Sequence, residues 1–297
     1  MPDIRRVTRR MGLRTAAAAA VTVPLLGTAS ASAARPGDGR LEVMTFNLRR
    51  ASAAGSHNWA ARRPVMRELL RRAAPDVIGS QEGLYRQLHD IEVDLGPHYD
   101  WIGTGRAGGS HDEFVAVLYD TRRLAPAEYD HFWLSDTPEV IGSNTWGGAC
   151  IRMVTWVRFR DLRGGGREFY LLNTHLDNAS RSARMRSVPL IALRIAALDP
   201  SLPLVVTGDF NAPAHAGPVY DDMLGAGLSD TWDAAAERGP LYGTFHGYQP
   251  PVPDGDRIDW ILATPGVTVH RATVNTFSRD GRFPSDHLPV QVSLTPG

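Results

Sequence analysis

Short apolar segments that each run into a polar residue recur along the whole chain, and this pattern constrains the fold more than any other feature. The polar residues at these segment ends are Asn47, Glu82, His175 with Asp177, Asp209 with Asn211, Asp259, and Asp286 with His287. Apolar runs of this length, bounded by Gly, Asn and Asp, are typical of buried strands. Because a sheet is rigid, it can hold the side chains at its strand ends in a fixed cluster. The pattern predicts a sheet protein with one polar site.

Helical patterns lie between the predicted strands. Strands are expected at 41–47, 76–81, 114–119, 153–159, 169–173, 202–207, 258–262 and 290–294. Helices are expected at 59–73, through Leu84, Leu88 and Ile91, and at 181–198, where Met185, Pro189 and Leu193 are candidate core contacts. Pro189 predicts a kink or an interruption in the last helix. Since no repeat or linker separates two cores, we expect a single α/β domain with two sheets.

The first 33 residues have the pattern of an export signal. Arg9 and Arg10 precede an apolar stretch at 16–26, and Ala31-Ser32-Ala33 is a candidate cleavage site. The stretch is too short to span a bilayer, so no stable membrane anchor is expected. The paired arginines are similar to a twin-arginine signal, with a general secretory signal as the alternative. We therefore expect a signal peptide at 1–33, a linker at 34–40 and a catalytic domain at 41–296 of a secreted protein.

The balanced charge of the chain is the sum of two unlike parts. The whole chain has 32 basic and 32 acidic residues, but residues 1–33 hold five arginines and one aspartate. Removing them leaves 27 basic and 31 acidic residues, a net charge of −4. Such a chain is not expected to bind long duplexes tightly, although an arginine-lined groove could still bind nucleic acid locally. A single cysteine, Cys150, excludes an intramolecular disulfide.

Taken in order, the polar strand ends resemble the motifs of the endonuclease/exonuclease/phosphatase superfamily. The matching segments are Thr45-Phe46-Asn47, Gln81-Glu82, Asn173-Thr174-His175-Leu176-Asp177, Gly208-Asp209-Phe210-Asn211, Arg257-Ile258-Asp259-Trp260 and Ser285-Asp286-His287. Its members include DNase I-like nucleases, deadenylases, inositol-phosphate phosphatases and neutral sphingomyelinases. Segments 132–139, 152–156 and 244–247 are similar to a secreted bacterial branch related to the deadenylase-like group.

The resemblance implies an α/β (α+β) sandwich, with two mixed, largely antiparallel β-sheets packed face to face and helices on the outside. It also implies a divalent-metal site at one end. Glu82 would be the main ligand, Asn47 would assist directly or through water, and Asp286 would lie in the outer shell. Carboxylate and amide oxygens suit Mg²⁺, with Mn²⁺ as an alternative. The chain has no cysteine cluster or H-E-x-x-H pair that would favour a closed zinc site.

Five further residues are implied to carry catalysis. Asp209 would align or help deprotonate the attacking water, and Asn211 would hold that water or a phosphate oxygen. His287 would be the general base or a charge stabiliser, oriented by Asp259. His175 would donate to a non-bridging phosphate oxygen or to the leaving group. The identity of the general base stays open among these groups.

Other polar and aromatic residues are candidate substrate contacts, each with an ordinary structural alternative. Arg152 could clamp a phosphate or form an ion pair, and Asp177 could contact substrate or shape a turn. His246 could line the pocket or be a loop histidine with satisfied ring nitrogens. Loop aromatics could stack on a base or sugar, although packing is their default role; they are Trp146, Phe245 and Tyr248.

We therefore expect a secreted, Mg²⁺-dependent hydrolase of phosphate esters, monomeric and without a membrane anchor. Its substrate is either a nucleic acid, cleaved by a nuclease or phosphodiesterase, or a small molecule such as a sugar phosphate. The mature charge fits the second better. A sphingomyelinase-like enzyme would need an exposed apolar hairpin for membrane contact, and the sequence has no clear one. A catalytically inactive binding module is the rival from another class, but such descendants usually lose a metal carboxylate or the final histidine. Here Glu82, Asp209, Asp259 and His287 are all present.

Overall fold

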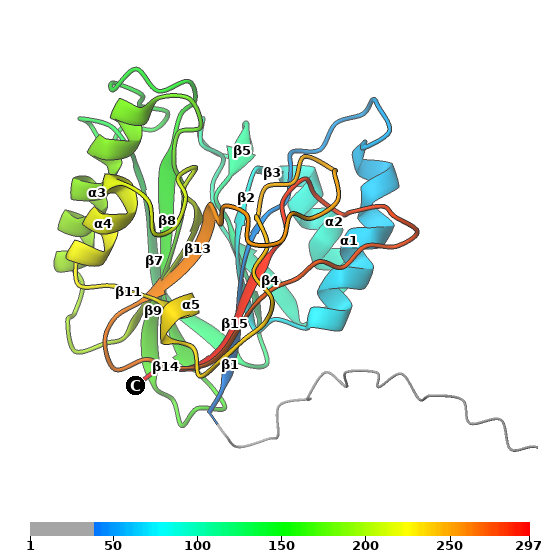
Figure 1. Cartoon of the computed structure of the whole chain (residues 1–297). Helices are drawn as coiled ribbons and strands as arrows, with labels where there is room; N and C mark the ends of the chain where they lie inside the picture. The colour runs from blue at the N-terminus through cyan, green and yellow to red at the C-terminus, as the bar shows by residue number, and fades with distance from the viewer. Residues whose placement is uncertain (1–38) are drawn as a thin grey trace, which may run out of the picture. The chain divides into compact units, whose positions relative to one another are not determined.

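Two β-sheets packed face to face form the centre of residues 39–297, the part of the chain that this computed structural model describes (Figure 1). The first sheet has seven strands in the order β12 (Glu237–Arg238), β14 (Thr268–Val274), β15 (Val290–Thr295), β1 (Leu41–Asn47), β2 (Val77–Gln81), β6 (Val117–Asp120) and β4 (Tyr99–Ile102). The second has six, in the order β11 (Ser229–Asp230), β13 (Asp259–Ala263), β10 (Leu204–Asp209), β9 (Glu168–His175), β8 (Met153–Asp161) and β7 (Leu124–Trp133). A short pair, β3 (Gly83–Leu84) and β5 (Glu113–Phe114), lies beside them.

Most neighbouring strands run antiparallel, but three pairs are parallel. These are β1 with β2, β9 with β10, and β12 with β14. The sheets are therefore mixed and largely antiparallel, which confirms the predicted sandwich.

Helices cover the outer face of each sheet. Helices α1 (Trp59–Ala73) and α2 (Tyr85–Leu95) pack on the seven-stranded sheet, and α3 (Arg181–Ala196) and α4 (Pro218–Gly225) pack on the six-stranded sheet (Figure 1). A short helix, α5 (Thr231–Ala234), contacts β14. No helix among residues 39–297 has the length and apolar character that a membrane crossing requires.

The residues of β1 explain why both faces of a sheet must be covered. Leu41 and Val43 point into the core between the sheets, whereas Met44 and Phe46 pack against the helices. All four are buried, so β1 reads as a nearly continuous apolar run, as expected for a strand inside a layered α/β protein. Asn47, the last residue of β1, is therefore buried at the end of the strand.

Several elements differ from the sequence prediction. The expected strand 114–119 is divided into β5 and β6, because β5 pairs with β3 whereas β6 pairs with β2 and β4. Helix α3 continues through Pro189 without interruption. Pro189 and Leu193 are both exposed, so these two expected core contacts are absent. Residues 1–33, predicted to be the signal peptide, lie outside the described residues.

Candidate active site

Strand direction brings the predicted catalytic residues to one edge of the sandwich. The parallel pairs β1–β2 and β9–β10 end there, which places Asn47, Glu82, His175 and Asp209 together. Strand β13 is antiparallel to β10 and therefore begins at the same edge, with Asp259 directly opposite Asp209 in the register. The site predicted from separate segments is assembled by this topology.

Asn47 links two carboxylates that come from different sheets. Its Nδ2 donates to Glu82 Oε1 at 3.0 Å and to Asp209 Oδ2 at 2.9 Å. Its Oδ1 accepts a hydrogen bond from the Arg49 amide at 2.9 Å, so both ends of the buried side chain are engaged. Asn47 therefore holds Glu82 and Asp209 near each other despite their like charges.

Glu82 is held in its ionised form. It adopts a positive φ of 64°, and its Oε2 accepts from the amide of Arg50 at 3.1 Å. Burial raises the pKa of Glu82, but the hydrogen bonds from Asn47 and from the Arg50 amide outweigh burial, so the pKa lies below its ordinary value. An ionised, largely buried carboxylate at this position is suited to bind a cation.

A buried Asp–His pair lies next to this link. Asp259 Oδ2 is 2.9 Å from His287 Nδ1, and His287 Nε2 is 3.8 Å from Asp209 Oδ2. Burial alone would lower the pKa of His287, but the negative charges of Asp259 and Asp209 raise it well above its ordinary value. The ring therefore points one nitrogen at its orienting carboxylate and the other at Asp209, as the predicted pairing requires.

His175 differs from His287 in its charge. Its Nε2 lies 3.4 Å from Asp209 Oδ2. Burial and the nearby positive charge of Arg152 hold the pKa of His175 well below its ordinary value, so its ring is neutral at physiological pH. Burial and the charge of Asp259 raise the pKa of Asp209. The amide of Asn211 donates to Asp209 Oδ1 at 3.0 Å, which places Asn211 against the same carboxylate.

Arg152 is buried close to His175 without a tight acidic partner. One guanidinium nitrogen donates to Asn178 Oδ1 at 3.1 Å, but Nε has no hydrogen-bond partner among the described residues. The nearest carboxylate oxygen, from Asp177, is 4.0 Å from Nε. Burial lowers the pKa of Arg152, because its guanidinium loses hydration without a close carboxylate to replace it. A substrate oxyanion would compensate that charge.

The two other candidate substrate contacts are occupied by backbone groups. Asp177 accepts hydrogen bonds from the amides of Cys150, Ala179 and Ser180, and so shapes the turn that leads into α3. The ring nitrogens of His246 lie 2.8 Å from the Gln249 carbonyl and 3.1 Å from the Ser285 carbonyl. The structure places both residues as supports of neighbouring loops.

Sequence reasoning missed several residues that hold the site in place. The Ser285 hydroxyl donates to the Asn47 carbonyl at 2.6 Å and accepts from the His287 amide at 3.2 Å. Thr244 Oγ1 accepts from the amide of Asp259 at 3.1 Å. Ser285 could have been found from its place in the Ser-Asp-His segment. Thr244 lies in the matched segment 244–247, but a loop threonine by itself does not indicate which backbone group it contacts.

The donor set fits a hard divalent cation. The carboxylates of Glu82 and Asp286 both approach the guanidinium of Arg49, at 3.9 Å and 3.5 Å, so they border the same small region. Asp209, Asp259 and His287 also lie together, with one ligand atom from each within 4.8 Å of the others, but there the charged ring of His287 already lies between the two carboxylates. Oxygen donors of this kind suit Mg²⁺ or Mn²⁺.

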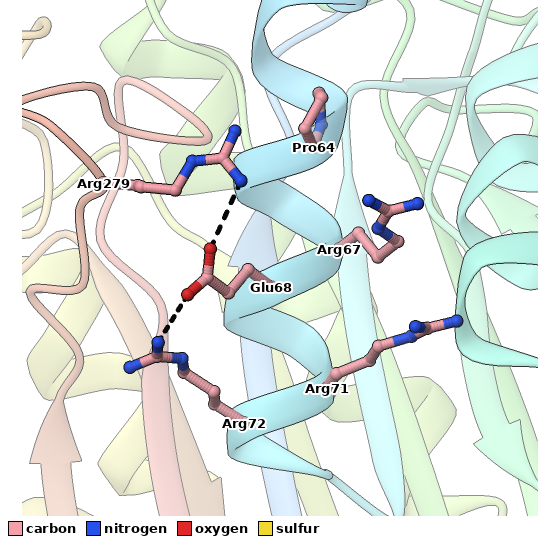
Figure 2. Close-up of a pocket in the computed structure, with 6 residues that line it drawn as sticks. All are labelled: Pro64, Arg67, Glu68, Arg71, Arg72 and Arg279. Carbon is pink, nitrogen blue, oxygen red and sulfur yellow. Dashed lines mark hydrogen bonds and ion pairs between the residues drawn. The ribbon is translucent and has the colours of Figure 1, made fainter.

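A basic pocket of about 280 Å³ lies apart from this site, on the outer face of α1 (Figure 2). It is lined by Pro64, Arg67, Glu68, Arg71, Arg72 and Arg279. Figure 2 shows Glu68 between Arg72 and Arg279, with which it forms ion pairs, and none of the predicted catalytic residues lines the pocket.

Comparisons with known proteins agree with this geometry. Residues 44–287 match the model of the Endonuclease/Exonuclease/phosphatase family. A mannosyl-6-phosphatase from Bacteroides thetaiotaomicron is 34% identical, with a TM-score of 0.79 over 86% of this chain and 99% of that chain. Another member from the same organism is also 34% identical, with a TM-score of 0.81 over 86% and 97%. The human Nocturnin catalytic domain shares the fold at 18% identity, with a TM-score of 0.67 over 88% and 95%. None of the curated proteins matches the chain.

Proposed function

Because this chain belongs to the endonuclease/exonuclease/phosphatase family, we propose that it is a secreted, divalent-metal-dependent phosphatase that hydrolyses small phosphomonoesters by water attack. The observation that carries this proposal is the junction of Glu82, Asn47 and Asp209 beside the Asp259–His287 pair. These groups provide a cation-binding carboxylate, a water-orienting carboxylate and a charged imidazole within one buried cluster. Such a set is what attack of water on phosphorus requires.

Glu82, with Asp286 behind it, would hold the metal ion. When bound, Mg²⁺ would polarise the phosphate and neutralise charge that develops in the transition state. Asp209 would orient the attacking water through a carboxylate oxygen, since its Oδ2 faces both histidines. His287, held by Asp259, would stabilise the negative charge of Asp209 and take part in moving the proton of that water.

The phosphate itself would be bound from the opposite side of the cluster. The guanidinium of Arg152 would donate to a non-bridging oxygen, because a largely buried guanidinium gains most from a charged acceptor. His175 is neutral, so it can donate one ring proton without adding a second positive charge next to Arg152. Asn211 would hold the attacking water or a phosphate oxygen beside Asp209.

The choice of a small monoester over nucleic acid is supported by charge and by similarity. A mature chain with a net charge of −4 lacks the basic surface that tight binding of a long phosphate backbone needs. The 34% identical relative is described as a mannosyl-6-phosphatase, and it matches over 99% of its own length.

Export is supported by the Arg9-Arg10 pattern, and replacing both arginines with Lys should block secretion if the signal is of the twin-arginine type.

The decisive experiment is a substrate panel on the mature protein with Mg²⁺, with Mn²⁺ and with EDTA. The panel contains p-nitrophenyl phosphate, bis(p-nitrophenyl) phosphate, sugar phosphates and single-stranded DNA. We expect metal-dependent turnover of the monoesters, and a loss of about 100-fold or more in Glu82→Gln, because the substitution removes the ligand charge. Calorimetry with Mn²⁺ should show weaker metal binding by the same variant.

Glu237→Gln, a change at an exposed glutamate on strand β12, is the matched control and should behave as wild type. Turnover that survives EDTA, or a fully active Glu82→Gln enzyme, would refute the proposed site. Preference for DNA over every monoester would replace the phosphatase with a nuclease.

A further inference from the structure

A pocket of about 430 Å³ opens beside the candidate active site, and we propose that it binds the hydroxyl-rich leaving group of a hexose phosphate. Segment 49–57 forms most of its wall, and Gly247, Tyr248 and Asp286 complete it. Arg49 and Asp286 belong both to this wall and to the group of charges around Glu82. A leaving group attached to a phosphate at the cluster would therefore extend into this pocket. The inference rests on the proposed phosphatase activity and adds the class of compound.

The wall is built as a rigid structure, which a binding site requires. Arg62 is wholly buried on α1 and donates to five backbone carbonyls at 2.7–3.2 Å, which belong to Leu48, Arg49, Arg50, His57 and Pro284. Gln87 on α2 donates to the carbonyls of Leu48 and Arg49 as well. One cation thus fixes both ends of segment 49–57, and its side chains are presented in a set arrangement.

An aromatic stack joins the two walls of the pocket. The ring of His57, from segment 49–57, lies on the ring of Tyr248 with centroids 3.7 Å apart and an interplanar angle of 10°. Tyr248 adopts a positive φ of 64°, which an L-residue takes up only when its surroundings hold it there. The stack therefore fixes the distance between the walls, and so the width of the space that a ligand can occupy.

The charges of the pocket are already balanced, which argues against a second phosphate as its ligand. Arg49 lies 3.5 Å from Asp286 and 3.9 Å from Glu82, and Arg50 lies 3.5 Å from Glu113. Each guanidinium has a carboxylate partner, so neither requires another anion. Its remaining N–H groups can still donate to neutral hydroxyls, and the carboxylate of Asp286 can accept from them.

The remaining lining favours a polyol over a nucleobase. Ser52 and Ser56 supply hydroxyls, and Ala54, Gly55 and Gly247 leave room between them. The stack of His57 on Tyr248 uses one face of each ring, and the rest of the lining is made of hydroxyls, small residues and charged groups that can bond to a polyol. A hexose presents hydroxyls around its whole ring, and the volume lies within the range of about 300–1,000 Å³ that is usual for small-molecule sites.

The test compares three substrates of the mature, Mg²⁺-loaded protein: mannose 6-phosphate, p-nitrophenyl phosphate and adenosine 5′-monophosphate. We expect His57→Ala to raise the KM for mannose 6-phosphate about tenfold, with little change in kcat, because the pocket contacts the leaving group equally in ground and transition states. Ser52→Trp fills the same pocket from an exposed loop position and should lower the ratio of kcat/KM for mannose 6-phosphate to that for p-nitrophenyl phosphate. His89→Ala, at an exposed histidine on α2, is the matched control.

The outcomes separate this inference from the function on which it rests. Absence of metal-dependent turnover of every phosphate ester would defeat the proposed phosphatase itself. Metal-dependent turnover of p-nitrophenyl phosphate with an unchanged substrate ratio in both variants would refute the subsite alone. Preference for adenosine 5′-monophosphate, weakened by either variant, would keep the subsite but overturn the hexose as its ligand.

Discussion

At the scale of single residues, Asn47 shows how the fold makes a site from groups that repel each other. Glu82 comes from the seven-stranded sheet and Asp209 from the six-stranded sheet, and one amide group donates to both. An aspartate at position 47 would add a third negative charge, and an alanine would leave two carboxylates facing each other. The asparagine is therefore the neutral donor that this junction needs.

The Asp259–His287 pair should act as one unit in catalysis. Because Asp259 contacts the ring at 2.9 Å, removing either partner should abolish the function of both. We expect Asp259→Asn and His287→Gln each to lower kcat/KM by about 100-fold or more, and the double variant to lose little beyond the worse single change. The measurement is a double-mutant cycle on p-nitrophenyl phosphate. Losses that multiply in the double variant would show that the two residues act independently.

Asp76 should make stability depend on pH. Burial raises its pKa from 3.8 to about 6, in spite of the hydrogen bond from the Glu42 amide. Folding thus favours the protonated form, so the contribution of Asp76 to stability is full below about pH 4 and is lost as the pH rises through 6. Two pKa units correspond to about 3 kcal/mol, which partial exposure reduces to about 1–2 kcal/mol.

Asp76→Asn removes this titration and keeps an oxygen that can accept from Glu42. The free energy of unfolding of the variant minus that of wild type should increase when the pH is raised from 4 to 7.5. Urea unfolding at both pH values measures this difference. Asp222→Asn, at an exposed aspartate on α4, provides the comparison. If the difference between Asp76→Asn and wild type is the same at both pH values, the assigned titration is wrong.

Much of the site could be read from the residues themselves, but not how each one is used. The order of polar strand ends predicted which residues meet, and the structure brings Glu82, Asp209, Asp259 and His287 together. It could not predict that Asp177 and His246 would be occupied by backbone groups. Those partners come from loops whose paths depend on the whole fold, and sequence spacing does not encode them.

At the scale of elements, the accuracy of the prediction followed burial. Strand β1 and helix α1 have the predicted bounds, because each has an apolar face that the core requires. Strand β7 was not predicted, since its middle is exposed and it contains Pro126. It lies at the edge of its sheet and needs one neighbour only, so its sequence is not constrained to alternate. Edge strands carry too little apolar pattern to be recognised alone.

Helix α1 should hold the loop after β1 through Arg62. Arg62→Met would leave five buried or partly buried carbonyls without their donor, at a cost of about 3–5 kcal/mol in the free energy of unfolding. Amide hydrogen exchange in residues 48–57 should become faster, because the variant loses the bonds that fix this segment. Arg67→Met, at an exposed position of the same helix, should change neither quantity. Unchanged exchange in Arg62→Met would mean that other contacts fix the loop.

At the scale of the whole molecule, the interface between the two sheets is apolar far from the site and polar beneath it. Far from the site it is apolar, with Val43, Val205 and Ile261 in one cluster. Nearer the site a polar network replaces it. Gln81 Nε2 donates to Asn173 Oδ1 at 2.8 Å, and Thr207 Oγ1 donates to the same oxygen at 3.1 Å. The Gln81–Asn173 bond crosses from one sheet to the other and helps to set how they are placed, whereas the Thr207–Asn173 bond joins neighbouring strands of the six-stranded sheet. Both sheets contribute residues to the junction at Asn47.

Gly79, in the middle of β2, is the position where this arrangement can be tested. A Cβ atom there would lie 2.0 Å from Thr207 Oγ1 and 2.7 Å from Asn173 Oδ1, both on the opposite sheet. Turning the Thr207 hydroxyl away does not relieve the clash, because Thr207 Cβ itself lies 2.8 Å from the added atom, so Gly79→Ala must push the sheets apart or break the network. We expect a loss of about 3 kcal/mol or more in the free energy of unfolding.

The same change should lower kcat at temperatures where the variant is still folded, because the Asn47 junction spans the two sheets that it separates. Adding Thr207→Gly removes the nearest clashing atoms and should recover part of both losses, which a purely local effect on β2 would not show. Gly225→Ala, where a Cβ atom meets nothing within 4 Å, is the matched control. Urea unfolding together with kcat/KM on p-nitrophenyl phosphate measures both effects. A Gly79→Ala protein as stable and active as wild type would show that the distance between the sheets does not determine the geometry of the site.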